Sequence, residues 1–385
     1  MSTTSRFAAV DRQTETVTPL ELFFDLVFVL ALTQCTAYMA DNLTWEGFVQ
    51  GLLVLGVLWW AWVGYSWLTS VVDPEEGIVR IAIFGAMAAF LVAALCIPEV
   101  FGDSAGLFAG AYAIVRFSQL GLFAIAARDK PALRRSLAGL NVGTAIGVAL
   151  VAAASFADGD LQLALWGLAL LLDVGEPFVF GAEGWQLVPA HFVERHGLIV
   201  IIALGESIVA IGVGAGHDID LGIVLAAVLG IAVAAALWWL YFDVVALVAE
   251  RRLSNAPPGR AQNEIARDSF SYLHFPMVAG IVLVALGFKK TLEHVEDPLK
   301  TIPAVALMCG AALYLLAHVA FRWRNVHRFS IQRLALAVVF VALIPAAKEL
   351  PALATLAIMT ALLVVLIVYE SVRFAELRER LRHQA

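Results

Sequence analysis

The chain of 385 residues is 61% hydrophobic and only 15% charged, and its mean hydropathy is +0.86. Soluble proteins average roughly 45–50% apolar and about 25% charged residues, so this composition excludes an ordinary soluble domain and indicates a polytopic membrane protein. The net charge of -7, without any long basic cluster, argues against nucleic-acid binding.

The predicted elements are membrane-spanning helices joined by short loops. A spanning helix needs about 20 apolar residues. By this measure the sequence predicts an all-α fold with twelve spans, at 19–40, 46–71, 78–98, 104–127, 133–156, 161–181, 197–215, 220–248, 270–288, 301–321, 331–347 and 351–372. The eleventh span is short, and Pro345 is expected to end or kink it.

The basic residues predict the orientation of these spans. With the N-terminus in the cytoplasm, most of the 25 lysine and arginine residues fall at inner loops or inner helix ends. Only Lys289, Lys290, Lys300 and Lys348 fall outside. Because cytoplasmic loops of membrane proteins are enriched in basic residues, we predict a bacterial inner-membrane protein with both termini in the cytoplasm.

The loops predict no separate soluble domain. The two longest polar stretches, 181–196 and 250–268, are each too short to bury a hydrophobic core of their own. The predicted organisation is a cytoplasmic segment at 1–18, a six-helix membrane unit at 19–181, a cytoplasmic linker at 182–196, a second six-helix unit at 197–372 and a cytoplasmic tail at 373–385.

A weak internal repeat relates the two predicted units. The first helix of each unit carries an acid, Asp25 or Glu206, and the second helix carries a tryptophan pair at nearly the same offset, 59–60 or 238–239. Two six-span repeats would lie parallel, related by an axis along the membrane normal, as the halves of many transporters do. Convergent composition is the alternative explanation.

Two acids lie in the first predicted span. Glu21 and Asp25 are four residues apart and therefore share one face of the helix. A carboxylate near the centre of a membrane helix costs about 2.5 to 3.5 kcal/mol, so each needs a partner or a task. One interpretation is a face that binds ions or carries protons. In the other, Glu21 caps the helix and Asp25 pairs with a basic residue such as Arg195.

A second acidic pair lies in the sixth predicted span. Asp173 and Glu176 share a helix face, and Pro177 follows directly. Because proline has no amide hydrogen, it leaves the carbonyl of Asp173 without its helical donor. Carboxylates and a free carbonyl together suit a hard cation or a proton relay. The alternative is an ion pair with Arg116, which lies within the fourth span and needs a counter-ion.

The seventh predicted span carries a further acid near the middle of the membrane. Glu206 is preceded by Gly205, which permits close helix packing, and is followed by the hydroxyl of Ser207. His274 in the ninth span and His318 in the tenth are candidates for a proton relay, because imidazole titrates near neutral pH. A packing role with a hydrogen bond to a neighbouring helix is the alternative for each of these residues.

Several motifs resemble those of the bacterial low temperature requirement A (LtrA) family. They are 20–29 (LELFFDLVFV), 191–207 (HFVERHGLIVIIALGES), 208–212 (IVAIG), 238–243 (WWLYFD) and 272–276 (YLHFP). The resemblance extends over nearly the whole chain and implies an integral membrane protein without a settled substrate. The lysosomal potassium channels are a more distant likeness, with an acidic first helix in two six-span units. Their Phe-Ser-Asp motif is replaced here by Phe-Phe-Asp at 23–25.

The acids of the deeper spans outnumber the single arginine there, which favours a cation or proton site over an anion site. We therefore predict a transporter that is embedded in membrane lipid and moves a cation, or a solute coupled to protons. A cation channel and a non-transporting protein of the cold or envelope-stress response are alternatives. The sequence has no phosphate-binding loop, metal-ligand spacing or nucleophile elbow, so we expect neither an enzyme nor a metal or other cofactor.

Overall fold

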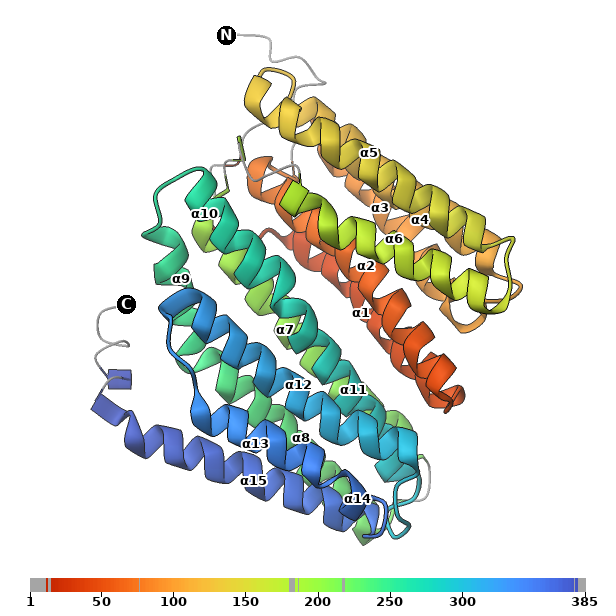
Figure 1. Ribbon diagram of the computed structural model, residues 1–385, viewed down its shortest axis with the longest axis vertical. Helices are drawn as coiled ribbons and strands as arrows, with labels where there is room; N and C mark the ends of the chain where they lie inside the picture. Colours follow the sequence, from red (N-terminus) through yellow and green to blue (C-terminus); the bar gives the residue numbers. More distant parts are fainter. Residues whose placement is uncertain are drawn as a thin grey trace. The chain divides into compact units, whose positions relative to one another are not determined.

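The computed structural model describes residues 12, 15–75, 77–179, 184–185, 187–216, 219–376 and 378–379 (Figure 1). The predicted segment 1–18 and the end of the predicted tail lie largely outside these residues. Within the described chain the helices are α1 (Pro19–Asp41), α2 (Trp45–Val71), α3 (Gly77–Cys96), η1 (Ile97–Glu99), α4 (Ala105–Ala126), α5 (Pro131–Ala154), α6 (Gly159–Val179), α7 (Pro189–Ala215), α8 (Leu221–Phe242), α9 (Val245–Ser254), α10 (Arg260–Ile265), η2 (Ala266–Tyr272), α11 (His274–Glu293), α12 (Thr301–Val326), α13 (Ile331–Ala342), α14 (Ile344–Ala347) and α15 (Ala352–Arg373).

The all-α membrane fold is confirmed. Eleven helical segments of the described chain are long and apolar enough to cross a membrane. Large apolar side chains such as Leu26 and Leu171 remain exposed on these helices. Such surfaces would be unfavourable in water but match the hydrocarbon of a bilayer.

The remaining predicted span, 331–347, is divided into two helices. The 12-residue α13 ends at Ala342, and α14 begins at Ile344, just before Pro345. After α14 the N–H of Ala352 donates to the carbonyl of Asp297 at 2.9 Å, so the chain has returned to the end at which α12 begins. Together α13 and α14 therefore run the length of α12 in the opposite direction (Figure 1).

Two predicted loops are wrong in their bounds. Between α9 and α10 only residues 255–259 lie outside helices, although the whole of 250–268 was expected to be a polar loop. From α10 the chain continues through the π-helical segment η2 into α11, which gives one helical segment, Arg260–Glu293. The expected linker 182–196 is also partly helical, because α7 begins at Pro189.

The described residues form two compact units. Unit 1 comprises the described residues up to Tyr38, together with Val49–Arg195 and Ala256–Ala266. Unit 2 comprises Met39–Phe48, His196–Asn255 and the described residues from Arg267 onward. The division into two six-helix units related by a repeat stays a prediction from the sequence.

The tryptophan pairs that suggested the repeat lie in different environments. In unit 1, Trp59 and Trp60 are buried, whereas in unit 2 Trp238 and Trp239 are 43% and 39% exposed. The acids at the matching positions, Asp25 and Glu206, are both buried. The two acids therefore share a buried environment, whereas one tryptophan pair is buried and the other is exposed.

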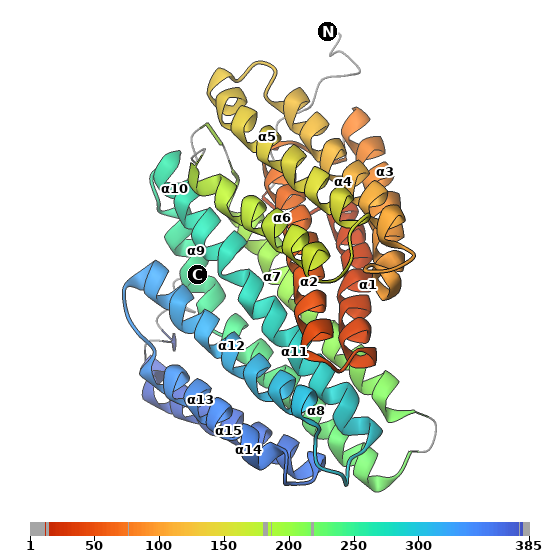
Figure 2. The same ribbon diagram turned by 45° about the vertical axis from the view of Figure 1, so that its right-hand side comes forward.

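Small residues set the closest helix packing in unit 2, between α11 and α12 (Figure 2). A Cβ atom added at Gly280 would lie 2.6 Å from the carbonyl oxygen of Gly310, and one added at Gly310 would lie 2.7 Å from that of Gly280. Glycine at both positions allows the two backbones to touch, which is the usual way in which membrane helices associate.

Candidate functional site

Unit 1 encloses two carboxylates that share one arginine. Glu21 and Asp25 of α1 are 1% and 0% exposed, and Arg195 of α7 is equally buried. Arg195 donates from Nη1 to Glu21 Oε1 at 2.6 Å and from Nη2 to Asp25 Oδ1 at 3.1 Å. We call Glu21, Asp25, Arg195, His191 and Arg12 the buried charge cluster.

Glu21 is held by donors on both of its oxygens. Besides Arg195, Oε1 accepts a hydrogen bond from His191 Nε2 at 2.8 Å. Its Oε2 accepts from Arg12 Nη1 at 3.1 Å and from the backbone N–H of Thr18 at 2.9 Å. Thr18 and Glu21 form a capping box at the start of α1, with Pro19 at the first helical position. Glu21 therefore caps the helix and anchors the cluster.

Asp25 is satisfied on one oxygen only. Its Oδ1 accepts from the indole Nε1 of Trp62 at 2.8 Å and from Arg195. Its Oδ2 is buried and has no hydrogen-bond donor among the described residues. Buried polar atoms are almost always hydrogen-bonded, so an exception requires an explanation. A carboxylate oxygen in this position can hold a proton or face a cation.

Apolar side chains close the space beside the cluster. Leu20, Phe24, Tyr65 and Ile83 line a small void next to Glu21 and Arg195 that has no room for a water molecule. This void therefore offers no water-filled route to Glu21 and Arg195.

The predicted pair in α6 contains one ion-paired acid. Asp173 Oδ1 accepts from Arg116 Nη2 at 2.9 Å, and its Oδ2 accepts from the hydroxyl of Tyr112 at 3.2 Å. The carbonyl of Asp173, which Pro177 leaves without its helical donor, accepts from the indole N–H of Trp60. The structure thus forms the ion pair that the sequence offered as the alternative at this position.

Glu176 is less completely bonded. It is 5% exposed, and its Oε1 has no hydrogen-bond partner among the described residues. Gly143 of α5 makes room for it, because a Cβ atom there would lie 2.3 Å from Glu176 Oε1. Glu176 therefore resembles Asp25 in being a buried acid with one unbonded oxygen.

The other predicted residues belong to unit 2. Glu206 and Ser207 of α7 are buried, and Ser207 Oγ has no partner among the described residues. In the neutral imidazole of His274, Nδ1 donates to the carbonyl of Ser269 at 2.9 Å and Nε2 accepts from the hydroxyl of Tyr241 at 2.8 Å. These bonds occupy both ring nitrogens of His274, as is typical of a packing residue.

His318 has one bonded and one unbonded ring nitrogen. Its Nδ1 accepts from Arg333 Nη1 at 3.0 Å, so the ring proton of the neutral imidazole lies on Nε2. Nε2 has no acceptor among the described residues. The rings of His274 and His318 lie 5.5 and 6.0 Å from that of Tyr241, so all three are neighbours.

His191 and Arg12 were not predicted from the sequence as members of these clusters, whereas Arg195 was offered there as a partner of Asp25. His191 and Arg195 are four residues apart and share one face of α7, a signal that becomes visible only once the helix is extended back to Pro189. Arg12 carries no local signal, because it lies in a polar segment before α1. The ion pair between Arg333 and Glu370 in unit 2 joins residues from α13 and α15 and was also not predicted.

Known proteins resemble this chain over most of its length. A protein of Rhizobium meliloti (strain 1021), described as uncharacterised, is 31% identical over 287 residues, which are 71% of this chain and 69% of the relative. No solved structure matches the chain significantly. The sequence profile of the bacterial low temperature requirement A proteins matches residues 16–368, which include the acidic motifs of α1 and α7. The resemblance is thereby confirmed, and this multi-pass membrane protein belongs to the bacterial low temperature requirement A (LtrA) family.

Proposed function

We propose that the protein transports a cation, or a solute coupled to protons, and that Asp25 carries the proton or contacts the ion. The observation that supports this is the buried Oδ2 of Asp25, which has no hydrogen-bond donor among the described residues. The other oxygen of Asp25 shares Arg195 with Glu21. Intramembrane acids that are not fully paired are typical of proton relays and ion pathways.

The buried charge cluster suggests how protonation would change the structure. With Asp25 ionised, Arg195 is held by two carboxylates; with Asp25 protonated at Oδ2, only Glu21 remains as its anionic partner. Glu21 keeps its place in either state, because Arg12 and the start of α1 also bind it. Proton uptake would therefore weaken the link between α1 and α7 at Asp25 while the link at Glu21 persists.

The other buried acids have supporting roles in this proposal. Glu176, with its own unbonded oxygen, is a second ion or proton site, and Arg116 balances the charge of Asp173. In unit 2, Glu206 and Ser207 are candidates for the same task, and His274 and His318 are candidates for a relay. The membrane orientation that we propose has both termini in the cytoplasm of the bacterial cell, at the inner membrane.

The proposal is tested by flux measurements in liposomes that contain purified protein and a pH-sensitive dye. Imposed sodium or potassium gradients should move protons in the wild type, and Asp25→Asn should abolish this movement. Asp103→Asn is the matched control, because Asp103 is exposed in the loop before α4. Cation leak without proton movement would favour a channel. Absence of any flux over a broad panel of solutes would favour a non-transporting protein.

A further inference from the structure

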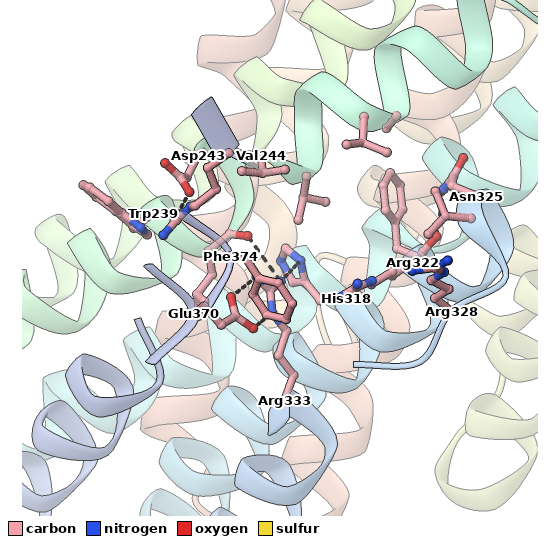
Figure 3. A pocket seen from close by; sticks show the side chains of 17 residues that line it. Trp239, Asp243, Val244, His318, Arg322, Asn325, Arg328, Arg333, Glu370 and Phe374 are labelled. Atoms are coloured by element: carbon pink, nitrogen blue, oxygen red, sulfur yellow. Dashed lines mark hydrogen bonds and ion pairs between the residues drawn. The ribbon is translucent and has the colours of Figure 1, made fainter. Parts of the chain in front are cut away.

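Unit 2 contains a cavity of about 350 Å³ that the sequence analysis did not anticipate. Its walls come from the ends of α8, α12 and α15, from α9, from the start of α13 and from the residues after α15 (Figure 3). A space of this size can hold a small molecule or part of a lipid.

The charged residues of the cavity leave an excess of positive charge. Four of the lining residues are arginines and two are acids. Arg333 pairs with Glu370 at 2.8 Å, and Arg378 pairs with Asp243. These pairs neutralise both acids, so the charges of the other two arginines are not balanced within the cavity.

The two remaining arginines are Arg322 and Arg328. Neither forms a hydrogen bond or an ion pair with the described part of the chain. Arg322 is half-buried in α12, and the charges of Arg333, Arg328 and Glu370 all act on it. In Figure 3 Arg322 and Arg328 lie near Asn325, and His318, whose Nε2 proton has no acceptor among the described residues, lies between Arg322 and Glu370. These donors would suit an anion.

The rest of the lining is mainly apolar. The lining includes Trp239 of α8, Val245 and Val248 of α9, and the aromatic rings of Phe321 and Phe374. A small hydrated anion would gain nothing from these side chains. A ligand that joins a negatively charged head to an apolar chain would contact both parts of the lining.

We propose that this cavity binds an anionic amphiphile, with a phosphate head on Arg322 and Arg328 and an apolar chain against the wall of α9. The proposal is independent of proton transport by Asp25, because it concerns other residues and binding alone. The ligand could be a membrane phospholipid or a soluble alkyl phosphate, since both offer the same head and chain. Either would supply the anionic partner that Arg322 and Arg328 lack among the described residues.

The test is the melting temperature of the full-length purified protein in detergent, titrated with phosphatidylglycerol, phosphatidylcholine, decyl phosphate or inorganic phosphate. A ligand that binds only the folded protein raises this temperature with concentration, which gives an apparent Kd. We expect stabilisation by phosphatidylglycerol or decyl phosphate. Tighter binding of the first would identify the ligand as a membrane phospholipid, and tighter binding of the second as a soluble alkyl phosphate. Phosphatidylcholine and inorganic phosphate should bind more weakly than that ligand.

The double variant Arg322→Gln, Arg328→Gln should weaken binding of the preferred ligand by about tenfold or more, since it removes the charge-assisted hydrogen bonds to the phosphate. The matched control is Arg134→Gln, Arg135→Gln, which removes the same charge from an exposed part of α5 and should bind as the wild type does. Val248→Phe keeps the charges but fills the apolar part of the cavity, and it should weaken amphiphiles without affecting inorganic phosphate.

Three results would overturn the proposal. The first is equal stabilisation by phosphatidylglycerol and phosphatidylcholine with no effect of decyl phosphate, because no anion preference would then exist. The second is unchanged affinity in the double arginine variant. The third is binding of inorganic phosphate as tight as that of the amphiphiles, together with normal amphiphile binding in Val248→Phe, because this would indicate a simple anion site. Proton flux in liposomes is a separate measurement, so failure here leaves the proposed transport function unaffected.

Discussion

At the scale of single residues, the buried acids differ in how completely they are bonded. Glu21 has donors on both oxygens, from Arg195 and His191 on one side and Arg12 on the other. Asp25 lies one helical turn away and lacks a donor on Oδ2. A fully bonded carboxylate is stable in one protonation state, whereas a partly bonded one can change state at lower cost. For this reason the function is assigned to Asp25 and an anchoring role to Glu21.

A stability prediction at this scale concerns Arg116 and Asp173. Arg116→Leu should destabilise the protein by about 3–5 kcal/mol, because it leaves the buried Asp173 carboxylate without its cation. The double variant Arg116→Leu, Asp173→Leu should recover most of this loss, since both charges are then absent. Thermal unfolding in detergent measures both effects. A double variant that is as unstable as the sum of the two single variants would show that the residues do not act as an ion pair.

At the scale of elements, the sequence predicted the long helices well and their charged ends poorly. Hydropathy found the apolar centres of the spans, but it treated the charged start of α7 as a linker. His191 and Arg195 lie in this charged start of α7 and are buried because they bind Glu21 of α1 within the same unit. The same error placed α10 in a loop. The effect of Pro177 was easier to predict, because the loss of the helical donor to the Asp173 carbonyl follows from local chemistry. The side chain that replaces this donor, Trp60, could not be predicted in the same way.

A prediction for the elements concerns the contact of α11 and α12. Gly280→Ala should destabilise the protein by about 1–3 kcal/mol, because the new methyl group would lie 2.6 Å from the Gly310 carbonyl oxygen and the helices would have to separate. Gly212→Ala is the matched control in α7 of the same unit, where an added Cβ meets no atom within 4 Å. The control should be neutral or slightly stabilising, because alanine favours helix. Equal melting temperatures for the two variants would contradict the close packing.

At the scale of the whole molecule, the number of crossings decides whether the two termini share one side of the membrane. Eleven described segments are long enough to cross, and an odd number would place the termini on opposite sides. We propose that the pair α13 and α14 supplies a twelfth crossing, because it runs back along α12 although neither helix is long enough alone. The break before Pro345 explains why this span is the weakest in the sequence.

This crossing predicts that the two ends of the pair lie on opposite sides of the membrane. In a variant whose three cysteines are replaced, a membrane-impermeant thiol reagent should label Glu349→Cys on intact cells and Phe329→Cys only after the cells are opened. Both positions are exposed in the structure, so neither is shielded by packing. Labelling of both from the same side would mean that α13 and α14 do not cross.

The composition alone was enough to predict a helical membrane protein, whereas the site could be predicted only in part. The acids were recognisable because charged residues are rare and costly in apolar helices. Arg195 and Arg116 were offered only as alternative partners, because Arg195 is 170 positions from Asp25 and such pairing depends on how the helices pack. The cavity of unit 2 was missed for the same reason, since its arginines occur at helix ends and look like ordinary membrane-flanking charges in the sequence.

The central claim is that Asp25 takes up and releases a proton inside the membrane. Infrared difference spectroscopy of the protein in lipid, recorded across a pH titration, tests this most directly, because a protonated carboxyl group has a carbonyl band that a carboxylate lacks. The wild type and Asp103→Asn should show a titrating band that is absent in Asp25→Asn. The same titrating band in Asp25→Asn would assign the proton to another acid and contradict the claim.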